Sequence, residues 1–259
     1  MSHDEEVAGV LEKYFGVTKV PHDEFAKDFL RRCQSYSVKL RDNVYKYYRR
    51  GSGPTVVLVH GIHSNLGSMV AIAEDLLELG FKVVLFDIPA HGESIGTKTD
   101  PVEVRDFIRK ICSKLGEIHA VICHSLGGLW ALSAMNGDFR ARAFISIASP
   151  STTKFLVEKF VQLNQVENEL AEVLVKELTN RFGEALWVDF SPCEIVKTIG
   201  MPGLIIHGEN DDFVPPDHAE QLHSNWAHAK VEMVESVGHF DIVGSPKVRK
   251  LITTYLQQL

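Results

Sequence analysis

Short runs that are apolar at every position recur along the chain, and between them apolar residues return every three or four positions. Uninterrupted apolar runs are typical of strands that are covered on both faces of a sheet. The segments between them, such as residues 67–79 and 126–135, have the spacing of helices. The apolar runs and similar short runs rich in β-branched residues predict strands at residues 55–59, 82–86, 119–123, 143–147, 203–206 and 230–234, most of which are apolar throughout.

Local signals mark the ends of several of these helices. Gly80 is a C-terminal stop for the helix over residues 67–79. Asp100 followed by Pro101 is an N-cap with a proline in the first helical position, and a further helix is expected from Pro246 to about Leu256. Strands that alternate with helices indicate a doubly wound, mostly parallel sheet with helices on both faces.

The region before these strands has a different pattern. Residues 35–40 and 44–49 alternate in polarity on either side of Arg41-Asp42-Asn43, which predicts a hairpin at an antiparallel edge of the sheet. With this hairpin the predicted sheet has eight strands and belongs to the α/β class. Residues 1–32 are expected to form one or two helices packed on the outside.

A long stretch without any strand pattern interrupts the alternation at residues 151–189, and its helical spacing predicts two inserted helices. Ser191-Pro192-Cys193-Glu194 then reads as a capping box with proline at the first position. An insertion of this kind is expected above the carboxyl ends of the strands, over the ligand crevice, although it could simply shield one sheet edge. The expected organisation is a helical extension (1–32), an α/β core (33–150 and 190–259) and a helical cap (151–189).

Composition narrows the classes of function. The chain has 259 residues, a length suited to one α/β domain, and its formal net charge of −7 argues against a nucleic-acid partner. No signal peptide is evident, and the apolar runs are too short to span a membrane. The four cysteines have no CxxC spacing, which favours reduced thiols and a cytoplasmic protein. The oligomeric state, monomer or dimer, is left open.

The residues VICHSLGG at positions 121–128 place Ser125 between a predicted strand and a predicted helix. This stretch resembles the nucleophile elbow of the α/β-hydrolase family, written G-x-S-x-G, in which a strained serine projects above the sheet. Residues two before and two after the serine must be small because strand and helix nearly touch. Gly127 fits this rule, whereas Cys123 departs from the usual glycine and has to fit into the core.

The same resemblance, which covers roughly residues 53–259, implies a triad in the order serine, acid, histidine. Residues 208–215, GENDDFVP, are similar to the family pattern G-x-x-D-x-x-V-P, which points to Asp211 as the acid. Its neighbour Asp212 stays as an alternative, and both aspartates could instead be turn-forming residues. His239, in SVGHFD after the last predicted strand, matches the position of the family's base.

Two further segments resemble family motifs. Residues 59–65, VHGIHSN, are similar to the oxyanion loop, which implies that the backbone N–H groups of Ile62 and Leu126 form the oxyanion hole. His60 is then expected to brace this loop and His63 to line the mouth of the pocket. Residues 86–94, FDIPAHGES, resemble the turn D-x-P-G-H-G-x-S, in which Asp87 and His91 are expected to be structural. The five-residue spacing of His218, His223 and His228 does not favour a metal site.

The resemblance implies a serine hydrolase that cleaves a carboxylic ester of a small, largely apolar substrate through an acyl-enzyme, with no metal or organic cofactor. A thioesterase, a lactonase, a carbon–carbon bond hydrolase or a non-catalytic ligand-binding relative are the alternatives. Phe155, Phe160 and Phe240 are candidate pocket residues. The apolar side chains of the cap equally suit packing within the cap, and this interpretation is favoured.

Overall fold

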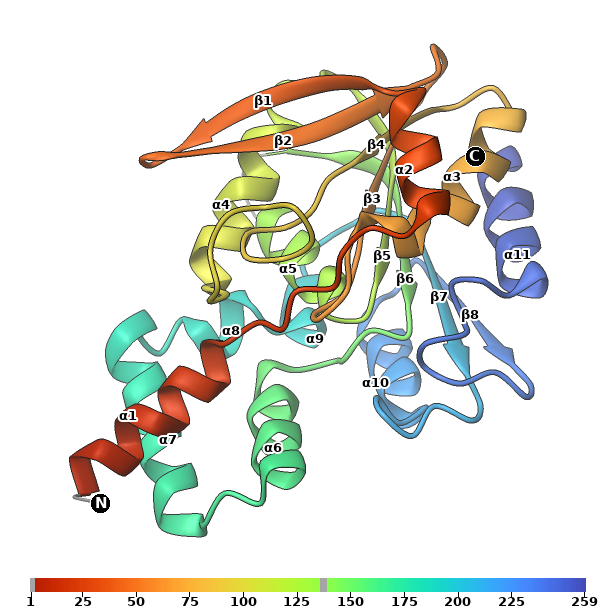
Figure 1. The fold of residues 1–259 in the computed structure, drawn as a ribbon. Coiled ribbons are helices and arrows are strands. Elements are labelled where there is room, and N and C mark those ends of the chain that lie inside the picture. The colour runs from red at the N-terminus through yellow and green to blue at the C-terminus, as the bar shows by residue number, and fades with distance from the viewer. Residues whose placement is uncertain (1–2, 136–138) are drawn as a thin grey trace.

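Eight strands form one mixed sheet in the computed structural model, which describes residues 3–135 and 139–259 (Figure 1). The strand order across the sheet is β1-β2-β4-β3-β5-β6-β7-β8. β1, β2 and β4 pair antiparallel, and the remaining neighbours pair parallel. The strands are β1 (Gln34–Leu40), β2 (Asn43–Arg50), β3 (Thr55–Val59), β4 (Lys82–Leu85), β5 (Ile118–His124), β6 (Ala141–Ile147), β7 (Gly203–Gly208) and β8 (Ala229–Val234).

Both faces of the central strands are buried, which explains why their sequences are mainly apolar. In β3 the side chains of Val57 and Val59 belong to one core, while those of Val56 and Leu58 belong to another on the opposite face. Successive side chains of a strand point to opposite faces, so a strand between two layers of helices needs an apolar residue at every position. The expected eight-stranded α/β fold is confirmed.

The helices form two layers on the sheet and a third group at one end of it (Figure 1). One face carries α2 (Glu24–Arg31), the 3₁₀ helix η1 (Leu66–Met69), α3 (Val70–Glu78) and α11 (Pro246–Gln257). The other face carries α4 (Pro101–Cys112), α5 (Leu126–Met135), α9 (Pro192–Val196) and α10 (Asp217–Asn225). Within residues 3–135 and 139–259, no helix combines the length and apolar character needed to cross a membrane.

Most predicted boundaries agree with the structure, with two informative differences. Gly80 follows α3 with φ +84°, and the Asp100 carboxylate accepts N–H groups at the start of α4, as expected. The segment at residues 67–79 begins as a 3₁₀ turn rather than as one continuous helix. The predicted capping box at Ser191 is wrong in one respect: the Ser191 hydroxyl does not cap α9 but accepts the N–H of Thr153 at 3.2 Å. This bond joins the two ends of the insertion.

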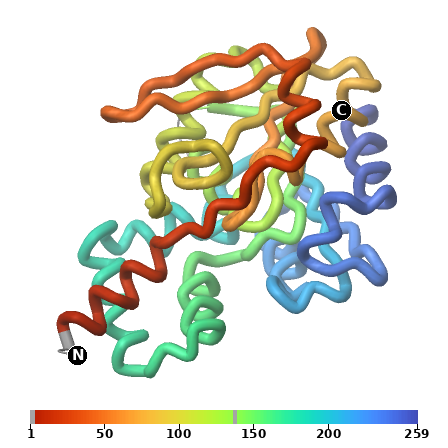
Figure 2. Tube along the Cα trace, in the orientation of Figure 1, coloured from red at the N-terminus to blue at the C-terminus, as the bar shows by residue number. Residues whose placement is uncertain are grey.

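The insertion contains the two predicted helices, α6 (Thr153–Asn164) and α7 (Asn168–Phe182), and also a short helix α8 (Leu186–Asp189). The N-terminal helix α1 (His3–Phe15) packs beside α7 rather than on the sheet (Figure 1). The chain then runs from α1 to α2, which contacts η1 and α3 (Figure 2). The N-terminal segment therefore connects the inserted helices with the core.

Candidate active site

Ser125 occupies the sharp turn between β5 and α5. Its φ of +53° lies in the left-handed region, which costs a residue other than glycine roughly 1–2 kcal/mol. Two backbone bonds hold this conformation: the Ser125 N–H donates to the Ile147 carbonyl at 2.9 Å, and the Ser125 carbonyl accepts from the Gly128 N–H at 3.0 Å. The turn therefore has the strained geometry that the resemblance to a nucleophile elbow implies.

The small residues around Ser125 are explained by close packing. A Cβ atom on Gly127 would lie 2.6 Å from the His60 carbonyl oxygen and 2.7 Å from that of Val59, so any side chain there would displace backbone. The Cys123 side chain is fully buried in the core, and burial raises the pKa of its thiol well above the usual value. Cysteine is thus tolerated at the position where the family motif has glycine.

Three side chains from distant parts of the sequence meet at this turn. The Ser125 Oγ lies 3.0 Å from Nε2 of His239, and Nδ1 of His239 lies 2.7 Å from Oδ2 of Asp211. All three residues are buried, with between 2 and 5% of their surface exposed. Ser125 follows β5, Asp211 follows β7 and His239 follows β8, so parallel strands bring them to one edge of the sheet.

Asp211 is held as a carboxylate by several donors. Its Oδ1 accepts the N–H groups of Phe213 at 3.0 Å and of Val214 at 2.8 Å. Burial alone would raise the pKa of Asp211, but hydrogen bonds from His207 and His239 hold it well below its usual value. The neighbouring Asp212 is exposed and makes no contact with the imidazole of His239 in the described structure.

His207 is a member of this cluster that sequence reasoning missed. Its imidazole is fully buried, with Nε2 2.8 Å from the Val214 carbonyl oxygen and 3.4 Å from Oδ2 of Asp211. It thereby ties the end of β7 to the loop that carries the acid. The available signal was a histidine at the end of an apolar run, directly before the GENDDFVP motif.

His124 precedes the nucleophile but has a different partner. Its Nε2–H donates to the backbone carbonyl of His239 at 2.9 Å, and the two rings lie 5.0 Å apart between centroids. Burial, and to a smaller degree the neighbouring His239, lowers the pKa of His124 to about 3. A neutral His124 therefore fixes the main chain of the His239 loop.

The loop after β3 passes directly beside the nucleophile. A Cβ on Gly61 would lie 3.0 Å from the Cβ of Ser125. His60 braces this loop as expected: its Nδ1–H donates to the Gly61 carbonyl at 2.7 Å, and its Nε2 accepts the Ile88 N–H at 3.1 Å. Ile62 and Leu126 both line the cavity described below, so the two segments expected to supply oxyanion donors border the same space.

The turn after β4 is built around Asp87. Its carboxylate accepts the N–H groups of Leu66 at 2.8 Å and of Glu93 at 2.9 Å, and it also pairs with Nε2 of His22 at 2.8 Å. Ala90, which replaces the usual glycine of this motif, has φ +68°. That value explains why glycine is common there, since the left-handed region favours glycine. Asp87 is structural, as predicted.

The buried His91 in the same turn is expected to lower the stability of the folded protein at acid pH. Its Nδ1–H donates to the Pro89 carbonyl at 2.9 Å, and burial lowers its pKa to about 3. Below the unfolded-state pKa of about 6.5, the unfolded chain binds a proton at His91, whereas the folded protein does not. The free energy of unfolding therefore falls as the pH falls from 6.5 towards 3. We expect a His91→Asn variant to lack this loss. Its deficit in unfolding free energy relative to the wild type should shrink by about 2 kcal/mol between pH 7 and pH 5.

Urea unfolding of both proteins at the two pH values measures this deficit. The exposed His223→Asn variant is the matched control for removal of a histidine. A deficit of His91→Asn that is the same at pH 7 and pH 5 would contradict the prediction, because it would mean that His91 takes up its proton equally in both states.

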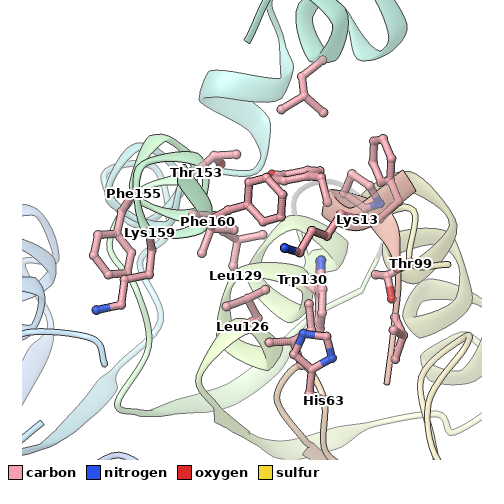
Figure 3. Close-up of a pocket in the computed structure, with 18 of the residues that line it drawn as sticks. Lys13, His63, Thr99, Leu126, Leu129, Trp130, Thr153, Phe155, Lys159 and Phe160 are labelled. Atoms are coloured by element: carbon pink, nitrogen blue, oxygen red, sulfur yellow. The ribbon is translucent and has the colours of Figure 1, made fainter. Parts of the chain in front are cut away.

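A cavity of about 610 Å³ lies between the core and the inserted helices (Figure 3). Its lining is mainly apolar and includes Ile62 and Leu126 beside the nucleophile. His63, Phe155 and Phe160, three of the four expected pocket residues, also line it. Phe155 and Phe160 make packing contacts as well, with the rings of His218 and Tyr14 respectively, so lining and packing are combined in the same side chains.

Phe240, the fourth expected pocket residue, lies elsewhere, and this expectation is wrong. Its side chain is 73% exposed and is not part of the cavity lining. Its ring packs edge-on against His239, with centroids 5.2 Å apart, and also contacts Phe213. His239 points towards Ser125, and the side chain that follows it points to the outside.

No group of three or more histidine, cysteine, aspartate or glutamate side chains in the described ranges has the arrangement of a metal site. His218, one of the three spaced histidines, is instead engaged through Nδ1, which accepts the Ser151 N–H at 3.2 Å. This bond attaches the start of the insertion to α10.

Comparison with known proteins adds a family and several distant relatives. A family model described as "Alpha/beta hydrolase family" matches residues 56–248. The chain is 24% identical over 180 residues to the protein YqkD of Bacillus subtilis. This alignment covers 65% of this chain and 59% of that protein. It is 22% identical over 237 residues to the pimeloyl-acyl-carrier protein methyl ester esterase of Nitrosomonas europaea. This alignment covers 76% of this chain and 93% of that protein. The chain thus spans less than two thirds of the length of YqkD.

Among solved structures, an esterase of Pyrococcus furiosus superposes with a TM-score of 0.71 at 19% sequence identity. The superposition covers 94% of this chain and 97% of that one. At this identity the likeness concerns the fold. With 94% of the chain covered, the superposition extends beyond residues 56–248, which the family model matches.

Proposed function

Because the chain belongs to the alpha/beta hydrolase family, we propose that it is a serine esterase with Ser125 as nucleophile, His239 as base and Asp211 as the group that orients the base. The observation that carries the proposal is the pair of bonds from Ser125 to His239 at 3.0 Å and from His239 to Asp211 at 2.7 Å. A serine hydroxyl becomes an effective nucleophile only when a neighbouring base takes its proton. Many activities share this fold, so the proposal rests on these side chains.

In the first half of the reaction, Nε2 of His239 takes the proton of the Ser125 hydroxyl as Oγ attacks the carbonyl carbon of the ester. The carbonyl π pair moves to oxygen and forms a tetrahedral oxyanion. When that intermediate collapses, the bond to the alcohol oxygen breaks and His239 returns its proton to the leaving alcohol. The acyl group is then bonded to Ser125.

In the second half, water replaces the alcohol. His239 takes a proton from the water as its oxygen attacks the acyl carbon, and it then protonates Oγ as the carboxylic acid leaves. Asp211 keeps the proton of the imidazole on Nδ1 and stabilises the cation that forms twice per cycle. The bonds that hold Asp211 as a carboxylate support this role.

The developing oxyanion is assigned to the backbone N–H groups of Leu126 and Ile62. Leu126 begins α5, where N–H groups have no partner within the helix and the helix dipole favours negative charge. Ile62 belongs to the loop that passes beside Ser125. Donors that are already in place when charge develops are worth about 10²–10³ in rate each.

The proposed substrate is a small ester with an apolar chain. The apolar lining next to Leu126 and Ile62 supports this class. The Nitrosomonas europaea relative, named for a methyl ester, supports ester hydrolysis. The mechanism uses only groups of the chain and water.

We expect wild-type protein to hydrolyse p-nitrophenyl butyrate and to react with a fluorophosphonate probe at Ser125. Mass spectrometry of the labelled tryptic peptide identifies the modified residue. A panel that adds thioesters and lactones of matched size then compares kcat/KM between bond types. A protein that neither turns over any of these compounds nor takes up the probe would be a non-catalytic ligand-binding relative, and the proposal would be wrong.

A further inference from the structure

We propose that residues 13–18, here called the N-terminal strap, form the far wall of the cavity and set the longest apolar substrate chain that fits. This inference rests on the proposed function, because it takes the cavity to hold part of the ester. The strap precedes the part of the chain that the family model matches. The strap would therefore select substrates by chain length through residues that lie outside the family's matched region.

The strap contributes a continuous run to the cavity lining, from Lys13 to Thr18. Lys13, on the strap, and Phe160, on α6, face Leu126 and His63 across the space in Figure 3. Leu126 directly follows the nucleophile in the sequence. A chain attached to the reacting carbonyl and extending away from Ser125 therefore meets the strap and α6 at the other end.

Backbone hydrogen bonds hold the strap against the core. The Thr99 N–H donates to the Phe15 carbonyl at 2.7 Å, and the Val17 N–H donates to the Thr97 carbonyl at 2.9 Å. Gly16 and Lys98 form an antiparallel bridge between these two bonds. The strap, which begins in the last turn of α1, is thus held beside residues 97–99 by two backbone bonds and one β-bridge.

Aromatic contacts attach the same segment to the inserted helices. The ring of Tyr14 meets that of Phe160 edge-on, with centroids 5.1 Å apart, and Phe15 meets Phe182 at 6.0 Å. The Arg181 guanidinium lies over the rings of Phe15 at 4.7 Å and Phe182 at 5.1 Å. The strap is therefore attached to the core on one side and to the inserted helices on the other. It closes the space between them.

Tyr14 is the residue of the strap best placed to limit chain length. It lines the cavity with a large ring, and burial raises the pKa of its phenol. Tyr14→Ala would extend the apolar space at the far end and leave the nucleophile, in the turn between β5 and α5, untouched.

The test is the chain-length profile of kcat/KM for wild type and for Tyr14→Ala. Two series are measured: p-nitrophenyl esters from acetate to palmitate, and alkyl acetates from ethyl to hexadecyl. For the wild type, kcat/KM should rise by about fourfold per buried methylene and then fall once the chain reaches the strap. In the series whose chain enters the cavity, Tyr14→Ala should move the optimum to longer chains. It should raise kcat/KM for the twelve-carbon chain relative to the four-carbon chain about tenfold, that is, laurate against butyrate or dodecyl acetate against butyl acetate.

Three further variants make the result specific. Tyr14→Phe keeps the ring and should keep the wild-type profile, whereas Tyr14→Trp should move the optimum to shorter chains. Phe25→Ala removes an exposed aromatic residue of α2 that does not line the cavity, and it should leave the profile unchanged. Thermal unfolding of each protein shows that it is folded. An optimum at the same chain length in wild type, Tyr14→Ala and Tyr14→Trp would overturn the proposal.

A binding measurement separates this inference from the proposed function. Dissociation constants of butyrate, dodecanoate and dodecanol are measured for the wild type and for Tyr14→Ala without any turnover. If the wild type hydrolyses no ester, the proposed function fails, but the strap is still supported when Tyr14→Ala tightens binding of a long chain and not of butyrate. Equal affinities of the two proteins for all three compounds would overturn the strap proposal even if the esterase proposal stands.

Discussion

Replacement of Ser125 by alanine is expected to reduce kcat for p-nitrophenyl butyrate by on the order of 10⁶-fold. The variant keeps His239 and Asp211 but has no oxygen to attack the ester. The remaining rate should come only from oxyanion stabilisation and substrate binding. Single-turnover kinetics and loss of fluorophosphonate labelling measure the effect. A variant that retains activity within tenfold of the wild type would show that another residue is the nucleophile.

A second variant at the same position tests the backbone conformation separately. Ser125 has φ +53°, a value that glycine adopts more easily than alanine. Both Ser125→Ala and Ser125→Gly lose the bond to His239, so their difference reports the backbone alone. We expect the glycine variant to be more stable by about 1 kcal/mol in the free energy of urea unfolding, with both inactive. Equal stability, or a more stable alanine variant, would mean that the turn stores no such strain.

Asp211→Asn should lower kcat by about 10⁴-fold with little change in the fold. The new amide oxygen can still accept the N–H groups of Phe213 and Val214, so the loop keeps its shape. The amide nitrogen then faces Nδ1 of His239, which has to become an acceptor. The imidazole proton then lies on Nε2, the atom that faces Ser125. With a proton already on Nε2, His239 cannot take the proton of the Ser125 hydroxyl.

Asp212→Asn is the matched control, because this neighbouring residue is exposed and the carboxylate bonded to the His239 imidazole is that of Asp211. We expect its kcat to stay within about threefold of the wild type, as for a surface substitution. Measurement of both variants with the same ester resolves the ambiguity between the two aspartates that the motif leaves. A larger loss in Asp212→Asn than in Asp211→Asn would reassign the acid.

Much of the core could be predicted because the relevant signals are local. β3 is buried at each of its five positions and apolar at four of them, because both its faces are covered. Gly80 ends one helix through its backbone, and Asp100 begins another through its side chain. Register along parallel strands then brings residues that follow β5, β7 and β8 to one edge. Motif order was therefore enough to choose Ser125, Asp211 and His239 as candidates.

Side chains whose partners lie far away in the sequence could not be assigned in this way. Ser191 has the sequence of a helix cap, but its hydroxyl binds the Thr153 N–H, 38 residues earlier. Phe240 is adjacent to the candidate base, yet the conformation of its loop turns it to the outside. His207 was overlooked because only the approach of the Asp211 loop to the end of β7 gives its imidazole a role.

The sequence by itself determined the α/β layers, because periodicity and turn chemistry act within a few residues. Its resemblance to motifs of the α/β-hydrolase family implied the elbow at VICHSLGG and the order of the candidate triad. Only the tertiary structure decided that residues 13–18 close the cavity against α6 and the core. The pattern of the first 32 residues predicts helices, but not which surface they cover. That choice depends on complementary side chains such as Tyr14 and Phe160, which lie 146 residues apart and meet only when the chain is folded.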